Sequence, residues 1–293
     1  MLALRVASIV FPVFAIIALG YGYGRRKQPQ LGATNQISMD VLVPALVFTA
    51  LASKTFDFAQ YHWLALAGVL VVLGSGLLAY PFARWLGVAP KTFVPPMMFN
   101  NSGNMGIPVL LLAFGDAALG AAIVLFLVEM VLHFSLGAWL LDRHAPRGQL
   151  LRTPVMLATL AGAAVGAAGL NLPSPLATAI RMVGDASIPM LLFALGVRMN
   201  QVSLRDWRIG VAGAVLCPLT GVIMVYLLAR WLPLPPAQQA YLLIFGVLPP
   251  AVLNYLMAEQ YRQEPERVAS LVLIGNLGAL ISMPLVLAFV LGS

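Results

Sequence analysis

Apolar residues run through this chain in stretches of about 16 to 25, separated by short clusters of charged residues, proline and glycine. A membrane-spanning helix needs about 20 predominantly apolar residues. The pattern therefore predicts an all-α polytopic membrane protein with ten spans. Their expected positions are 6–24, 34–53, 63–86, 93–114, 117–141, 155–170, 176–199, 209–232, 241–261 and 268–291.

Composition agrees with this pattern, because 61% of the 293 residues are hydrophobic and only 9% are charged. Soluble domains carry about 25% charged residues. A chain with so few charges cannot cover a water-facing surface, which excludes a soluble enzyme, a nucleic-acid-binding protein and a disordered regulator. The segment 6–24 runs into Arg25 without a small-residue cleavage site, so we expect it to be a span and not a removed signal peptide.

Loop charges predict the orientation of the chain in the membrane. Thirteen of the 17 Lys and Arg residues fall in one alternate set of connections and three fall in the opposite set. Cytoplasmic loops carry the excess of Lys and Arg. We therefore expect both termini on the non-cytoplasmic side of a bacterial inner membrane, with membrane lipids around the spans.

Matching motifs predict an internal repeat. D-x-x-x-P-x-L-x-F begins at Asp40 in the second segment and again at Asp185 in the seventh, and A-R-W-L ends both the third and the eighth segments. A third match pairs Pro12 and Gly20 with Pro154 and Gly162. All these offsets lie at about 142 to 146 residues, so three matches in one order indicate two copies of one unit.

Each copy holds five spans, an odd number, so the second copy must be inserted upside down. We expect one repeat at 1–141, a cytoplasmic linker at 142–154 and an inverted repeat at 155–293. Inverted repeats are typical of secondary transporters, whose substrate site lies between the repeats near the bilayer midplane.

Two corresponding segments are predicted to be broken helices. The fourth carries polar residues, glycines and a proline within nine positions: Asn100, Asn101, Ser102, Gly103, Asn104, Gly106 and Pro108. The ninth carries Pro249, Pro250 and Asn254. Irregular backbone is tolerated at membrane depth only where protein or a watery cavity satisfies its polar groups. Half-helices that begin at such breaks present free N–H groups and partial positive charge, which suits a carboxylate. The alternative is a pair of structural kinks without substrate contact.

Intramembrane polar residues supply candidates for ion coupling. Glu129 and His133 lie four residues apart on one face of the fifth segment, and a buried carboxyl is costly unless it is neutral or paired. We expect this pair to carry a coupling proton, and the alternative is a carboxyl that only bridges helices. Asp40, Asp185 and Asn276 are secondary candidates. Asp185 follows Arg181 by one turn, which favours a structural ion pair, whereas Asp40 lies close enough to the membrane surface to reach interfacial water.

The quoted segments resemble the auxin efflux carrier family, which includes bacterial organic-acid permeases and the plant PIN carriers. The likeness is carried by four stretches: 43–48, 100–108, 184–189 and 248–261. It implies that broken helices cross in spans 4 and 9, and that spans 3–5 and 8–10 move as an elevator against a dimeric scaffold of spans 1, 2, 6 and 7. On that likeness Asn101 and Ser102 fall on the polar crossover, and Asn254 replaces a crossover proline. The third segment departs from the plant carriers, because it has no acidic residue.

These inferences predict a secondary transporter for a small organic anion, such as the dicarboxylates malate and malonate, with a proton or sodium as coupling ion. Alternatives are an auxin-like weak-acid efflux carrier, a uniporter and a passive anion channel. We expect no enzyme activity, no cofactor, no metal site and no nucleic-acid partner. The intramembrane aspartyl protease pattern fails, because its Pro-Ala-Leu motif precedes Asp185 here. The chain has no Gly-x-x-x-x-Gly-Lys-Ser/Thr phosphate loop, so active transport must use an ion gradient or exchange.

Overall fold

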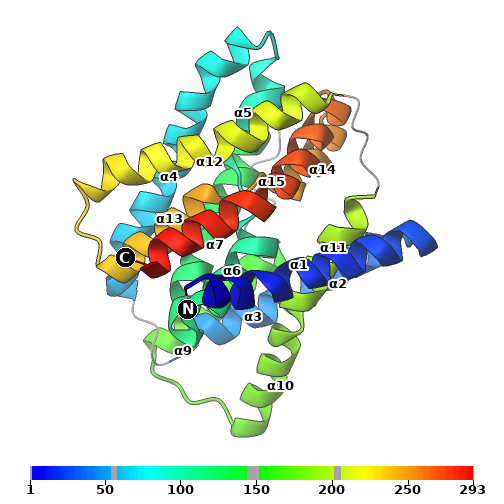
Figure 1. The fold of residues 1–293 in the computed structure, drawn as a ribbon. Coiled ribbons are helices and arrows are strands. Elements are labelled where there is room, and N and C mark those ends of the chain that lie inside the picture. Colours follow the sequence, from blue (N-terminus) through cyan, green and yellow to red (C-terminus); the bar gives the residue numbers. More distant parts are fainter. Residues whose placement is uncertain (1, 54–57, 144–151, 201–205, 293) are drawn as a thin grey trace. The chain divides into compact units, whose positions relative to one another are not determined.

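The computed structural model describes residues 2–53, 58–143, 152–200 and 206–292, and every regular element in these ranges is a helix (Figure 1). This confirms the predicted all-α class. Most of the expected linker at 142–154 lies outside the described residues, as do Lys54, Arg147 and Arg205 from the loop charges.

Seven helices or helix runs in the described ranges are long and apolar enough to cross a membrane, and each coincides with a predicted segment. They are α1 (Leu2–Lys27); α2 (Gly32–Ile37), η1 (Ser38–Leu42) and α3 (Val43–Leu51); α4 (Phe58–Trp85); η3 (Asp116–Ala118), α7 (Leu119–Leu132), η4 (His133–Gly137) and α8 (Ala138–Leu141); α10 (Ser174–Asp185) and α11 (Ser187–Arg198); α12 (Trp207–Ala229); and α15 (Pro265–Gly292).

The other three predicted segments form shorter helices. One is a single helix of 14 residues, α9 (Pro154–Ala167). The fourth segment is divided into α5 (Pro90–Met98), η2 (Ser102–Gly106) and α6 (Ile107–Phe114), and the ninth into α13 (Pro236–Val247) and α14 (Val252–Gln260). α5, α9 and α13 each begin with proline, which is favoured there because the first helical N–H has no partner within the helix.

The chain divides into two compact units, and the first comprises 1–14, 62–145 and 201–293. This unit contains α5 to α8, most of α4, and α12 to α15. In it α12 and α15 pack along each other, and α13 packs against both (Figure 1). The side chains of Phe93, Phe99 and Phe245 are among the largest that are fully buried in its core. Both interrupted helices therefore belong to one compact body.

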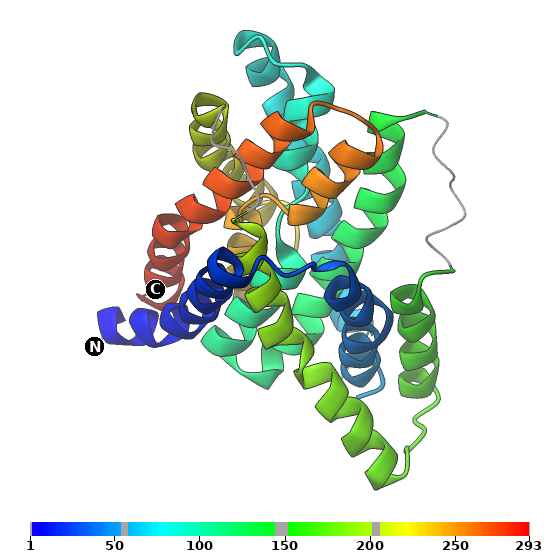
Figure 2. The ribbon, with the colours of Figure 1, turned by 90° about the vertical axis from the view of Figure 1, so that its right-hand side faces the viewer.

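The second unit comprises 15–61 and 146–200. In it α3 packs against α9 and α10, and α11 runs on from α10 (Figure 2). Two helix contacts in this unit depend on glycine: a Cβ on Gly20 would lie 2.1 Å from the carbonyl oxygen of Phe193, and one on Gly162 would lie 3.0 Å from that of Phe48. The sequence repeat pairs Gly20 with Gly162 and Phe48 with Phe193, so the unit makes one kind of close contact twice.

Candidate transport site

The first interruption extends over three residues, Phe99 to Asn101, between α5 and η2. Phe99 has an extended backbone, with φ −101° and ψ 103°. The chain becomes helical again at Ser102 as a π-helical turn that leads directly into α6. Pro108, which we predicted to be part of the broken segment, lies in α6 and outside the interruption.

The second interruption comprises Leu248 to Ala251, between α13 and α14. Leu248 and Ala251 are both extended, with ψ 144° and 143°. Pro249 and Pro250 lie between them and have no backbone N–H. This segment therefore offers more carbonyl acceptors than donors.

The two interruptions cross and bond to each other. An isolated antiparallel bridge joins them at Asn100 and Pro250. Two backbone hydrogen bonds flank the bridge: from the Asn101 N–H to the Pro249 carbonyl (2.7 Å), and from the Ala251 N–H to the Phe99 carbonyl (2.9 Å). Polar backbone groups left unpaired at membrane depth are costly. Each interruption thus satisfies groups that the other exposes.

Three buried asparagines reinforce this crossing, and none is more than 6% exposed. Their amide nitrogens donate to backbone carbonyls: Asn100 to Phe245 (2.7 Å), Asn254 to Phe99 (2.8 Å) and Ala251 (3.0 Å), and Asn276 to Pro250 (3.0 Å) and Val272 (2.8 Å). Asn276 also accepts a bond from the Asn101 amide at 3.1 Å. These donors are occupied by the protein itself, so they position the crossing segments.

Close contacts on the second interruption leave little free space around it. A Cβ on Gly275 would lie 2.5 Å from the Pro250 ring, and a Cβ on Gly106 would lie 2.8 Å from the Leu248 side chain. The buried Cys217 thiol on α12 donates to the Leu248 carbonyl at 3.5 Å. Three elements, η2, α12 and α15, therefore pack against this short segment.

Glu129 and His133 on α7 and η4 each lie next to a different part of the crossing, and each is 3% exposed. The Glu129 carboxyl has the Ser102 side chain as a hydrogen-bond partner, at the start of η2. The His133 ring stacks on Phe99, with centroids 4.1 Å apart and planes 8° from parallel, and lies beside Asn254. One helix face therefore contacts residues from both interrupted segments.

Three buried oxygen atoms near the crossing accept no hydrogen bond from the described residues. They are Asn100 Oδ1, Asn254 Oδ1 and Glu129 Oε2. An unsatisfied buried acceptor costs about 1–3 kcal/mol, so each is an unusual feature of a folded protein. All three would be satisfied by a small cation, a water molecule or a donor group of a ligand, and Glu129 Oε2 also by a proton.

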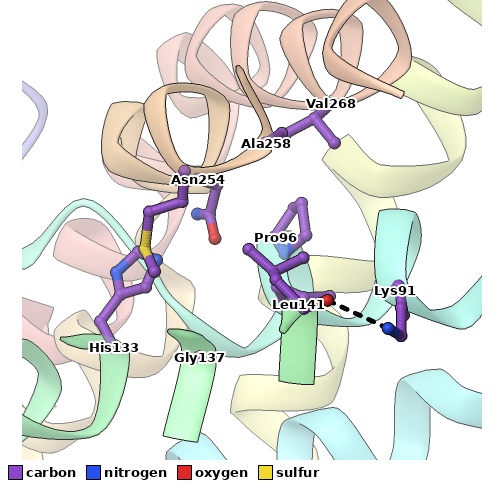
Figure 3. A pocket seen from close by; sticks show the side chains of 10 residues that line it. Lys91, Pro96, His133, Gly137, Leu141, Asn254, Ala258 and Val268 are labelled. Atoms are coloured by element: carbon purple, nitrogen blue, oxygen red, sulfur yellow. Dashed lines mark hydrogen bonds between the residues drawn. The ribbon is translucent and has the colours of Figure 1, made fainter. Parts of the chain in front are cut away.

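A small cavity lies beside one of these residues, Asn254 (Figure 3). It is lined by His133 and Asn254 at buried positions and by Lys91 at an exposed position, with apolar side chains between them. Its volume of about 10 Å³ is that of roughly one water molecule. A dicarboxylate is too large for this space, so the described conformation is closed at this point.

Comparison with known proteins places the chain among transporters. The model of the membrane transport protein family matches residues 138–287, which is just over half of the chain. The chain belongs to this family. The match confirms the resemblance to auxin efflux carrier permeases, and it confirms that the protein is a membrane transporter and not an enzyme.

Two relatives of this membrane transport protein align over nearly the whole chain. A protein of Rhizobium meliloti (strain 1021) named "Putative malonate transporter" is 26% identical over 295 residues, covering 93% of this chain and 92% of its own. An uncharacterized transporter of Methanocaldococcus jannaschii is 19% identical over 289 residues, covering 91% and 93%. Both alignments are long enough to include the two interrupted segments. With the apolar helices, they support a multi-pass protein embedded in a membrane.

The remaining predicted residues of this membrane transport protein are placed apart from the crossing or at its border. Asn104 is half-buried within η2. Asp40 and Asp185 belong to the second unit, and both are exposed. Asp185 lies 3.8 Å from Arg181 in an exposed ion pair along α10, as its spacing predicted.

Several residues of the crossing carry no signal in the sequence. Phe99 and Phe245 act through their carbonyl oxygens, which every residue has, and Gly275 is one glycine among 26. Lys91 enters the sequence-based prediction only as a loop charge. Its place beside a buried cavity depends on how α5, η4 and α14 pack, which no local pattern reports.

Proposed function

We propose that the crossing of the two interrupted helices is the substrate site of a secondary transporter for a small organic anion, such as a dicarboxylate. The crossing itself is the observation that carries this proposal. It brings the starts of η2 and α14 into one buried polar region of a single compact unit. Helix starts have N–H groups without helical partners and partial positive charge, which favour anions. The relative named for malonate supports the dicarboxylate class.

The proposed site keeps the predicted residues but divides their roles. Ser102 and the free N–H groups at the two helix starts would meet the anion. The asparagines would hold the segments in place through bonds to backbone carbonyls. The proposed set is Asn100, Asn101, Ser102, Asn104, Pro249, Pro250 and Asn254, with Pro108 at its border because it lies outside the interruption.

We propose coupling to a proton or a sodium ion at Glu129, with His133 beside it. The unpaired oxygens of Glu129, Asn100 and Asn254 support this proposal, because the Glu129 carboxylate can take up a proton and carboxylate and amide oxygens together suit a hard cation. Asn276 fits a supporting role better than a coupling role, because both of its amide donors and its oxygen have protein partners.

An elevator motion is the form of alternating access that we propose. The two interrupted segments are joined by hydrogen bonds, so separating them would expose buried polar groups. Moving spans 3–5 and 8–10 as one body against spans 1, 2, 6 and 7 would change access while keeping these bonds. The division into two units supports most of this assignment, because spans 3–5 and 8–10 fall in the first unit and spans 2, 6 and 7 fall in the second. Span 1 is divided, with residues 1–14 in the first unit and the rest in the second.

We propose that the scaffold forms a homodimer in a bacterial inner membrane, with both termini on the non-cytoplasmic side. Arg181 and Asp185 lie within the run Ser174–Arg198, yet both are exposed on the monomer. Charged groups at membrane depth are costly when they face lipid. A second copy that covers them would remove much of that cost.

Counterflow in proteoliposomes tests the transport proposal. Vesicles loaded with unlabelled malonate should transiently accumulate external radiolabelled malonate, with saturable rates, whereas a passive channel would give no accumulation. We expect Asn101→Ala to lower this uptake several-fold, because the change removes its bond to Asn276 at the crossing. Asn171→Ala, at an exposed asparagine of the second unit, is the matched control. Equal uptake by Asn101→Ala and the parent would remove Asn101 from the site.

A further inference from the structure

At the exposed end of the cavity in Figure 3 lies one charged residue, Lys91, whose side chain reaches across to the opposite wall. Lys91 is exposed, whereas the next nine residues along the chain, 92–100, are all buried. Its ammonium donates to the carbonyl oxygen of Leu141 at 3.0 Å, which joins the start of α5 to the end of α8 (Figure 3). Both residues line the cavity. The hydrogen bond therefore lies across the outer end of the passage that leads inward to Asn254.

Because the rest of the lining is uncharged, the Lys91 ammonium determines whether an anion or a cation is favoured in the cavity. Between Lys91 and the buried end, the walls consist of proline, glycine and aliphatic or thioether side chains. No acidic residue is among the described residues that line the cavity. Lys91 forms no ion pair with the described residues. Glu264, which bonds to the neighbouring Thr92, is itself paired with Arg267 at 2.6 Å and so does not neutralise Lys91. A single cation at the mouth of an apolar passage attracts anions and repels cations.

A carboxylate can take the place of the Leu141 carbonyl as the acceptor of the Lys91 hydrogen bond. A hydrogen bond between an ammonium and a carboxylate is charge-assisted on both sides and is stronger than one to a neutral carbonyl. The next residue, Thr92, is fixed separately: its hydroxyl donates to Glu264 at 2.5 Å and accepts from Gln263 at 2.9 Å. Release of Lys91 from Leu141 would therefore free the opening while the start of α5 stays attached to the turn before α15.

We propose that Lys91 is the residue that admits the anion and also the latch that closes its path. In the closed conformation the Lys91 ammonium bonds to the Leu141 carbonyl, and an arriving carboxylate takes over the ammonium and releases α8. This inference builds on the proposed anion transport and adds a residue that sets charge selectivity. It does not require malonate to be the substrate.

Thiol labelling of the purified protein in detergent tests the inference without any transport assay. The background is Cys217→Ala, and a cysteine is placed inside the cavity by Ala258→Cys. The probes are an anionic methanethiosulfonate (sulfonatoethyl), a cationic one (trimethylammonioethyl) and the uncharged methyl reagent. We expect the anionic probe to label the Ala258→Cys protein on the order of tenfold faster than the cationic probe, relative to the control Ala168→Cys at an exposed site.

Adding Lys91→Met should bring this anion-to-cation ratio to within about twofold of the control, and should speed labelling by the uncharged reagent because the latch is lost. Lys91→Arg should keep the ratio. An unchanged ratio in Lys91→Met would overturn the inference, and so would an equal change in rate for all three probes, which indicates a purely structural contact. A normal ratio with no malonate uptake would support the inference and contradict the proposed substrate.

Discussion

The two interrupted segments pair with each other's buried backbone groups, but they contribute different chemical groups to this pairing. The first, Phe99 to Asn101, is followed by Ser102 and contributes amide, hydroxyl and backbone donors. The second is built around Pro249 and Pro250 and contributes chiefly carbonyl acceptors. Two donor-rich segments would leave buried N–H groups unpaired, and two proline segments would leave carbonyls unpaired. The comparison shows that two interruptions can pair through their backbones while their residues differ in a complementary way.

Just before each interruption, a glycine on a neighbouring helix contacts the chain closely. We expect the largest effect from adding a methyl group to these two glycines, and we expect the two to respond differently. A Cβ on Gly221 would lie 1.8 Å from the backbone oxygen of Gly246, whereas a Cβ on Gly76 would meet the flexible Met98 side chain at 2.4 Å. We expect Gly221→Ala to destabilise the protein by about 3 kcal/mol or more and Gly76→Ala by about 1 kcal/mol. Thermal unfolding and size-exclusion chromatography in detergent measure both. Equal losses would show that the two contacts are equally rigid.

Glu129, which lies beside Ser102 at the end of the first interruption, should control the pH dependence of transport. Glu129→Gln keeps the size of the side chain near Ser102 but cannot exchange a proton, so we expect uptake to lose its pH dependence while the protein stays folded. Glu259→Gln, at an exposed position of α14, is the control and should keep it. Initial uptake rates between about pH 5 and 8 provide the measurement. Full pH dependence in Glu129→Gln would assign the proton to another group.

The buried side-chain amides of Asn100 and Asn254 should contribute unequally to the stability of the protein. Asn254 donates two hydrogen bonds and Asn100 donates one. At about 1 kcal/mol for each net hydrogen bond, Asn254→Ala should cost about 2 kcal/mol and Asn100→Ala about 1 kcal/mol. Thermal midpoints of the two variants, measured in the same detergent, test the ranking. A larger loss for Asn100→Ala would show that its unpaired oxygen has a role that the protein contacts do not explain.

Prolines inside and outside the interruptions should respond differently to replacement. Pro250 packs its ring against Gly275, so Pro250→Ala leaves a gap and should cost about 1–2 kcal/mol. Pro108 lies outside the crossing, in the helical run that continues from η2 into α6, where alanine is a good helix former. Pro108→Ala should therefore cost less than about 0.5 kcal/mol and keep near-parental uptake. Thermal unfolding and uptake of both variants make the comparison. A severe Pro108→Ala defect would restore that proline to the site.

The sequence was informative wherever local chemistry conflicts with a regular apolar helix. Four polar residues at 100–104 and the paired prolines at 249–250 mark the interruptions, because such residues have few stable alternatives at membrane depth. Pro108 does not mark an interruption, because the π-helical turn η2 leads directly into α6 and the chain stays helical at this proline. The partners Phe99, Phe245 and Gly275 depend on tertiary packing, which residue identity and spacing do not encode.

The bond between Cys217 and the Leu248 carbonyl gives the protein a reporter of its own. Cys217 is the sole cysteine of the sequence, is 3% exposed, and lies directly behind the second interruption. Because the thiol is buried there, it becomes accessible to a reagent when α12 and residues 248–251 separate. The rate of its modification in native protein therefore measures how often this contact opens, and a ligand that tightens the contact would slow that rate without any probe being introduced.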